Sequence, residues 1–235
     1  MTPIMTSATT PSPATAAKSP PASRSTPRPV GILLAGGRGV RYDPTGQCNK
    51  LLAPLIHGAQ PGVPIALLAA QHMKAALARV IAVVRPDGAQ AQALARLLED
   101  AGCEVLMTAA AQRGMGASLA AGVTASLTAD IDKSQAADTT TSLSGWVIAL
   151  ADMPALAPAT IAAVSAALLN DNAIAAAWYR GQRGHPVGFG RAHGAALAQL
   201  DGDTGARALL NSTRVIRIDT EDAGVLRDVD SPEAL

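Results

Sequence analysis

The chain has 235 residues, of which 49% are hydrophobic and only 2% aromatic, and its formal net charge is +1. This length suits one α/β domain with a core of small aliphatic side chains. The near-neutral charge excludes a general attraction to nucleic acid or to an anionic membrane, so local groups must bind any anion. The two cysteines, Cys48 and Cys103, have no metal-ligand spacing, which favours a reducing compartment. We therefore expect a cytoplasmic protein.

Residues 1–28 are rich in Ser, Thr, Pro and Ala and contain no apolar block long enough for a signal peptide. Their prolines oppose an amphipathic helix, so we expect a disordered extension, with a transit-like role left open. No later stretch has the roughly 18 uninterrupted apolar residues that a membrane span needs. The composition predicts a folded domain over residues 29–235.

Apolar runs of strand length alternate with longer Ala- and Leu-rich segments, which is typical of repeated strand–helix units. The predicted strands are 30–34, 80–84, 104–107, 146–150, 174–178 and 215–218. The predicted helices are 65–77, 89–100, 117–127 and 159–169. Short strands that are apolar on both faces are typical of buried parallel sheets. We expect a three-layer, Rossmann-like α/β fold with a mostly parallel central sheet.

Two segments depart from this alternation. Residues 128–144 carry Asp, Thr and Ser without periodicity, which predicts a flexible, exposed insertion. Residues 181–191, "GQRGHPVGFGR", hold too many glycines for a regular element, which predicts a loop. Such a loop could close over an anionic second substrate through Arg183 and His185. The alternative is that His185 merely packs beneath the loop.

The segment "GILLAGGRGVRYDPTGQCNKLLAPL", residues 31–55, combines a strand with a glycine-rich turn. The turn lies at the carboxyl edge of the predicted sheet, where parallel sheets bind ligands. Its backbone amides could wrap phosphate oxygens, and its cations could neutralise them. The spacing fits neither the Rossmann fingerprint nor a P-loop, and a plain glycine turn with surface arginines is the alternative. The candidate nucleotide-binding residues here are Leu34, Ala35, Gly36, Gly37, Arg38, Arg41 and Lys50.

Two further segments carry candidate residues. In "WVIALADMPAL", Asp152 follows a buried strand and suits Mg²⁺, which takes few carboxylates plus phosphates and waters. A carboxylate at a helix N-terminus near Thr160 is the alternative. In "QRGMGASLAAGV", Gly114 would let a base or ribose approach the backbone, and Ser118 could hydrogen-bond it. A plain helix cap is the alternative for Ser118.

The stretch "LAGGRGVRYDPTGQCNKLLAPL" is similar to the signature "LAGGxxxRxG…K" of the MobA-like NTP transferases, which include molybdenum cofactor guanylyl- and cytidylyltransferases. In this chain Tyr42 and Asp43 replace the last glycine, and the loop before Lys50 is long. The resemblance implies a nucleotidyltransferase fold. It also implies that Arg41 and Lys50 are catalytic and hold the β- and γ-phosphates.

Other motifs extend this resemblance. The family's "D[TM]P" favours the metal role of Asp152, which would also be catalytic and bind the nucleotide. The closing "RDVDSPEAL" resembles the family's "DIDTPEDL" and makes Asp230 the second metal ligand, with Asp228 as the competing candidate. For Asp230 a helix N-cap is the other reading. The motifs "GMxxSLxxG", "GxxGHPVxF" and "LxGDxGARALL" resemble the cytidylyl-transferring relatives, whereas "LAGG" resembles the guanylyl-transferring ones.

The resemblance implies Mg²⁺-dependent transfer of CMP from CTP to the phosphate of molybdopterin cofactor, with release of pyrophosphate. Arg183 and His185 would bind the cofactor, and a molybdoenzyme or its maturation chaperone would be a further partner. We expect no nucleic-acid or membrane partner. A guanylyltransferase, or an enzyme acting on a sugar phosphate or another small phosphate, is one alternative. A noncatalytic carrier of nucleotide or molybdenum cofactor is the other.

Overall fold

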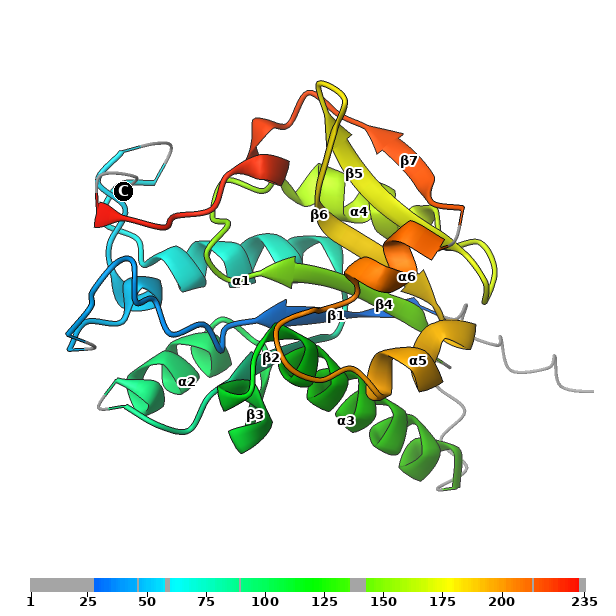
Figure 1. The fold of residues 1–235 in the computed structure, drawn as a ribbon, viewed down its shortest axis with the longest axis horizontal. Coiled ribbons are helices and arrows are strands. Elements are labelled where there is room, and N and C mark those ends of the chain that lie inside the picture. Colours follow the sequence, from blue (N-terminus) through cyan, green and yellow to red (C-terminus); the bar gives the residue numbers. More distant parts are fainter. Residues whose placement is uncertain are drawn as a thin grey trace, which may run out of the picture.

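The computed structural model describes residues 28–45, 47–57, 60–88, 90–135, 143–212 and 214–232. Its centre is a seven-stranded sheet in the order β3-β2-β1-β4-β6-β5-β7 (Figure 1). The strands are β1 (Arg28–Leu34), β2 (Val80–Val84), β3 (Glu104–Met107), β4 (Leu143–Leu150), β5 (Ile174–Tyr179), β6 (Gln182–Gly190) and β7 (Ile216–Asp219). β6 pairs antiparallel with β4 and β5, and the other pairings are parallel. The predicted α/β class and mostly parallel sheet are confirmed.

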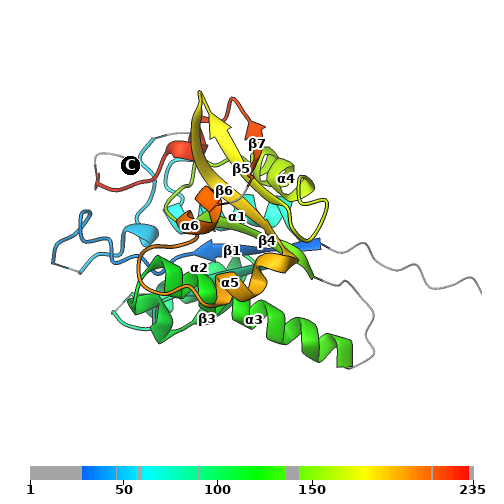
Figure 2. The same cartoon turned by 45° about the vertical axis from the view of Figure 1, so that its right-hand side comes forward.

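Helices cover both faces of this sheet. Those on one face are α1 (Ile65–Ala76), α2 (Ala91–Asp100) and α4 (Pro158–Ala166). Those on the other are α3 (Met115–Gln135), α5 (Gly194–Ala198) and α6 (Arg207–Ser212). Short 3-10 turns are η1 (Lys50–Leu52), η2 (Ala109–Gln112), η3 (Arg191–His193) and η4 (Ala223–Leu226). α3 and α5 lie side by side in both views (Figures 1 and 2).

Alternation along the strands divides the core between the two faces. Leu33 of β1 packs in the cluster that contains Ile65 of α1, whereas its neighbour Ile32 packs in the cluster that contains Leu119 of α3. Successive side chains of a strand point to opposite faces, so an apolar run is needed to fill both clusters. The three-layer arrangement therefore follows from central strand segments, such as Val80–Val84, that are apolar on both faces.

The prediction of a loop at 181–191 is wrong, because Gln182–Gly190 forms β6 inside the sheet. Its glycines meet packing demands rather than a turn. A Cβ at Gly188 would lie 3.0 Å from Val164 Cγ1 and 3.2 Å from Leu168 Cδ2, so the glycine lets α4 pack directly on the strand. The local sequence around Gly188 does not reveal that α4 packs this closely on the strand.

The predicted insertion at 128–144 is largely replaced by regular structure. α3 continues to Gln135, and β4 begins at Leu143. Residues 136–142 lie outside the described residues, as do residues 1–27, which carry the predicted disordered extension. Among the described helices, none combines the length and apolar character that crossing a membrane requires.

Candidate active site

The glycine-rich turn and Asp152 leave the sheet side by side. Leu34 ends β1 and is in register with Leu150, which ends the neighbouring parallel strand β4. The amide of Ala151 donates to the carbonyl of Leu34 at 3.0 Å. Because the two strands end together, the segment after each one emerges at the same edge. In Figure 1 the C-terminal segment, drawn in red, returns to this edge.

A cavity of about 710 Å³ lies at this edge. It brings together all the candidate nucleotide and metal residues except Ala35, which is buried in the core. Its lining includes Leu34, Gly36, Gly37, Arg38, Arg41, Lys50, Gly114, Met115, Ser118, Asp152, Asp203, Asp228 and Asp230. The residues that the sequence analysis selected from four separate segments thus share one cleft, whereas Arg183 and His185 of the fifth line another cavity.

Lys50 lies at the centre of the charged part of this cavity. Its Nζ donates to Asp152 Oδ2 at 2.6 Å, to the carbonyl of Val229 at 3.0 Å and to Asp230 Oδ1 at 3.4 Å. The residue is only 8% exposed. Asn49 accepts from the amide of Leu51 at 3.0 Å and so caps the η1 turn that carries Lys50. The lysine is therefore held by local capping and by contacts with two distant segments.

Three carboxylates converge around Lys50. One oxygen each from Asp152, Asp228 and Asp230 lies within 4.8 Å of the others. The amide of Val229 donates to the carbonyl of Asp152 at 2.8 Å, which ties the C-terminal segment to the end of β4. The sequence analysis treated Asp228 as a competitor of Asp230, but the structure places both beside Asp152.

The alternative position of Asp152 at the helix near Thr160 is not observed. The Thr160 hydroxyl donates to Asp222 Oδ2 at 2.8 Å instead, and Asp222 also accepts from the amide of Ala157 just before α4. Asp222 therefore supports the start of α4, which leaves Asp152 in the cavity. Asp230 meets the guanidinium of Arg41 at 2.5 Å in addition to Lys50.

The glycine turn packs against the start of α3. A Cβ at Gly36 would lie 2.9 Å from Ala111 Cβ and 3.2 Å from Ser118 Oγ, whereas one at Gly37 would meet nothing within 4 Å. Ser118 is 3% exposed, and its hydroxyl donates to the carbonyl of Gly114 at 2.8 Å. Gly36 thus permits the turn to touch α3, and the Ser118 hydroxyl already braces the first turn of that helix.

Asp43 organises the long loop before Lys50, a role that the sequence analysis missed. Its carboxylate accepts from the Thr45 hydroxyl at 2.6 Å, the Cys48 amide at 2.6 Å and the Thr45 amide at 2.8 Å. These hydrogen bonds, led by that from the Thr45 hydroxyl, lower the pKa of Asp43 to about 2. The available signal was an aspartate two residues before a threonine, which is typical of an Asx turn.

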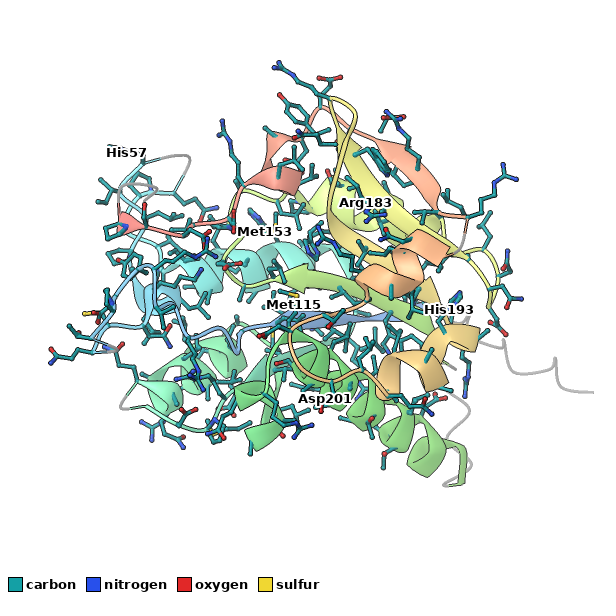
Figure 3. The ribbon with its side chains drawn as sticks, in the orientation of Figure 1. His57, Met115, Met153, Arg183, His193 and Asp201 are labelled. Atoms are coloured by element: carbon teal, nitrogen blue, oxygen red, sulfur yellow. The ribbon has the colours of Figure 1, made fainter. Side chains whose placement is uncertain are left out.

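A second cavity of about 310 Å³ adjoins the first and shares Leu34, Met115 and Asp203 with it. Arg183 lines it and donates to Asn211 Oδ1 at 3.2 Å (Figure 3, which labels Met115 and Arg183). Asp203 was overlooked in the sequence, although it is the aspartate of the "LxGDxGARALL" motif. The residue connects the two cavities beside Gly114.

His185 also lines this second cavity, at the end of β6 nearest the carboxylates. Its Nδ1 lies 3.4 Å from the carbonyl oxygen of Ile148, which can only accept. Burial lowers the pKa of His185 below its usual value, so the ring is neutral at pH 7. His185 therefore lies within β6, is half-buried and lines the second cavity, so it matches neither of the two alternatives fully.

The chain is similar to a known protein family over most of its length. The family model for the MobA-like NTP transferase domain matches residues 31–218. The chain belongs to this family. The match covers every strand except the start of β1 and the last residue of β7, and it makes the protein a nucleotidyltransferase. A comparison with curated proteins returns no match.

Solved structures share the fold of this MobA-like domain. Rv0371c from Mycobacterium tuberculosis is 24% identical, with a TM-score of 0.61 and coverage of 89% of this chain and 96% of that one. Its complex with manganese gives 22% identity, a TM-score of 0.55 and coverage of 82% and 88%. Mth528, a nucleotidyl transferase from Methanothermobacter thermautotrophicus, is 19% identical, with a TM-score of 0.66 and coverage of 88% of this chain and 94% of that one.

The aspartate cluster of this MobA-like domain fits a divalent metal. Carboxylate oxygens are the hard donors that Mg²⁺ and Mn²⁺ prefer. Asp152 Oδ1 is buried and has no hydrogen-bond partner among the described residues, which leaves one ligand atom unused beside Asp228 and Asp230. A buried carboxylate oxygen without a partner is costly, and a bound cation would remove that cost.

Proposed function

We propose that the protein is a Mg²⁺-dependent cytidylyltransferase that transfers CMP from CTP to the phosphate of molybdopterin cofactor. One observation carries the proposal: Lys50 and the carboxylates of Asp152, Asp228 and Asp230 share a cavity with the glycine turn at the end of β1. Transfer between phosphates needs positioning and charge neutralisation, and these groups supply both.

Each part of the cavity has a proposed task. The amides of Gly36 and Gly37, with Arg38, hold phosphate oxygens, and Arg41 and Lys50 neutralise the β- and γ-phosphates. Asp152 and Asp230, joined by Asp228, hold the metal. When bound, the metal neutralises charge on the α-phosphate and aligns the incoming phosphate.

The reaction is an exchange of phosphate bonds. An ionised phosphate oxygen of the acceptor attacks the α-phosphorus, and the bond from that phosphorus to the bridging oxygen of the β-phosphate breaks. The electron pair leaves with pyrophosphate, whose charge Lys50 and Arg41 stabilise. The nucleophile carries no proton, so the mechanism requires no general base.

The second cavity supports the acceptor assignment. Arg183 and Arg207 both line it and offer cations for a phosphate, and it shares Met115 and Asp203 with the nucleotide cavity. His185 is neutral there and would contact the acceptor by packing or by a single hydrogen bond. The product would pass to a molybdoenzyme or its chaperone in the cytoplasm.

GTP is the second candidate nucleotide, and Gly36 is the observation that favours it. The cytidylyl-transferring relatives more often have alanine in this position of the turn. Here an added Cβ would lie 2.9 Å from Ala111 Cβ, so the turn is built for the glycine of the guanylyl-transferring type. The motifs at 112–123 and 181–191 favour CTP.

The test is to incubate the purified protein with each nucleoside triphosphate, Mg²⁺ and molybdopterin cofactor, and to follow pyrophosphate. We expect release with CTP. Release with GTP alone would support the second candidate, and release only with sugar phosphates would move the enzyme to another acceptor class. Nucleotide binding without any pyrophosphate would identify a noncatalytic carrier.

A further inference from the structure

The ammonium group of Lys50 lies where a metal ion would contact the aspartates. Its Nζ is 2.6 Å from Asp152 Oδ2 and 3.4 Å from Asp230 Oδ1, and both residues belong to the cluster whose oxygens lie within 4.8 Å of one another. The carbonyl of Val229, between Asp228 and Asp230 in sequence, accepts a third hydrogen bond at 3.0 Å. The lysine thus binds two carboxylates of the cluster, and Arg41 also pairs with Asp230.

The surroundings strengthen this ion pair. The Lys50 side chain is 10% exposed and that of Asp152 is 20% exposed, so water screens their attraction little. A divalent cation that entered this cluster would meet the ammonium at a few ångströms and would compete with it for Asp152 Oδ2 and Asp230 Oδ1. Like charges at that separation repel strongly in a partly buried site. Metal and lysine therefore exclude each other from the same oxygens.

Lys50 has a second anionic partner in the proposed reaction. The stem of its side chain passes 3.5 Å from the Cβ position of Gly39, in the turn assigned to the phosphates, and the residue lines the cavity beside Gly36 and Gly37. A triphosphate in this cavity offers the ammonium several negative oxygens within the reach of a flexible side chain. The lysine can then leave the carboxylates without losing its charge compensation.

We propose that Lys50 excludes the divalent cation from the aspartate cluster until a triphosphate draws the ammonium away, so that metal and nucleotide bind together. This inference rests on the proposed function, because it takes the phosphate role of Lys50 as given. The metal alone then binds weakly, and nucleotide and metal strengthen each other's binding. Such coupling limits metal binding in the absence of substrate.

The test is a titration of the full chain with Mn²⁺ alone, followed by the electron paramagnetic resonance signal of free Mn²⁺. Lys50→Met and Lys50→Gln remove the charge and keep an unbranched side chain. We expect both variants to bind Mn²⁺ at least about tenfold more tightly than the wild type. Lys74→Met is the matched control, since Lys74 donates to the carbonyl of Ala78 on an exposed surface. It should leave the affinity unchanged.

A second measurement uses the unaltered protein and does not depend on the folding of a variant. A CTP analogue with a methylene group between the α- and β-phosphates should increase Mn²⁺ binding by the protein at least about tenfold beyond that of the analogue alone. Equal Mn²⁺ affinity in wild type and both Lys50 variants, or no increase with the analogue, would overturn the inference.

These outcomes separate the inference from the proposed function. If wild type and Lys50→Met bind Mn²⁺ equally, the competition between Lys50 and the metal is refuted. The proposed function is then still tested separately by pyrophosphate release. If no form of the protein binds Mn²⁺ with or without the analogue, the competition and the metal assignment both fall.

Discussion

Individual residues at the end of β1 and β4 decide what this MobA-like domain can bind. Lys50 and Asp152 are 102 positions apart, yet they form an ion pair of 2.6 Å in the cavity. Asp152 could be predicted because it follows an apolar run, and the carboxyl ends of parallel strands meet at one edge. Asp228 and Asp230 were treated as competing candidates, although residues i and i+2 of an extended chain lie on one face and can reach the same site together.

Substitution of Arg41 should weaken binding of the triphosphate without changing the stability of the fold. Its side chain is 76% exposed and contacts Asp230, so the pair contributes little to folding. We expect Arg41→Gln to raise the KM for the triphosphate about tenfold, in line with the loss of one charge-assisted contact. The free energy of unfolding, measured with urea, should change by less than about 1 kcal/mol. A KM equal to that of the wild type would remove Arg41 from the phosphate site.

Asp43 gives a pH-dependent prediction. Its pKa of about 2 in the folded protein lies below the usual value, so its hydrogen bonds stabilise the loop above about pH 4 and are lost as the pH falls from there toward 2. At pH 7, Asp43→Ala should remove this stabilisation, accelerate hydrogen exchange at the Thr45 and Cys48 amides and raise the KM for the triphosphate.

The control for this experiment is Asp219→Ala, which removes an exposed carboxylate on β7 that pairs with Arg217. It should leave exchange at Thr45 and Cys48 as in the wild type. If Asp43→Ala also leaves both amides unchanged, the carboxylate does not organise the loop, and the departure from the family signature at Tyr42 and Asp43 has another cause.

At the scale of elements, the sequence predicted what local pattern controls and failed where distant packing decides. β2 and β3 have the predicted bounds, because their apolar runs are flanked by polar residues and turns. β6 was predicted as a loop because glycine disfavours strands. A Cβ at Gly184 would overlap the carbonyl of Val225, and Gly188 faces α4. Both glycines are therefore required by contacts with segments distant in sequence, which a local sequence pattern does not reveal.

Gly188 therefore offers a prediction about the fold. In Gly188→Val the new side chain would press on Val164 and Leu168, which already lie 3.0 and 3.2 Å from the Cβ position. We expect a loss of about 1–3 kcal/mol in the free energy of unfolding, measured with urea. Gly37→Ala, where no atom lies within 4 Å of the Cβ position, should stay within about 0.5 kcal/mol. Equal losses in the two variants would contradict the packing argument.

Over the whole molecule, the two cavities share Leu34, Met115 and Asp203 and adjoin each other where the parallel strands β1 and β4 end. The cavity that we propose for the nucleotide is lined by the β1 turn and the start of α3, and the one that we propose for the acceptor by β6 and the chain between α5 and α6. The net charge of +1 gives no overall attraction for anionic substrates, so selection depends on these local cations. This division predicts that the two substrates can be impaired separately.

Arg183 tests that division. Arg183→Gln should raise the KM for the phosphate-bearing acceptor by about tenfold or more and leave the KM for the triphosphate within about twofold, because the residue lines the second cavity and not the first. The measurement is pyrophosphate release with each substrate varied in turn. An increase only in the KM for the triphosphate would show that the acceptor does not bind in the second cavity.

The most direct test of the whole account compares pyrophosphate release from CTP by the wild type and by Asp152→Asn, with Mg²⁺ and molybdopterin cofactor present. The substitution keeps the shape of the side chain and removes the charge that pairs with Lys50 and would hold the metal. The account predicts release by the wild type and a rate at least about 100-fold lower in the variant, with both proteins folded by circular dichroism. Equal rates would contradict the assignment of this edge of the sheet as the active site.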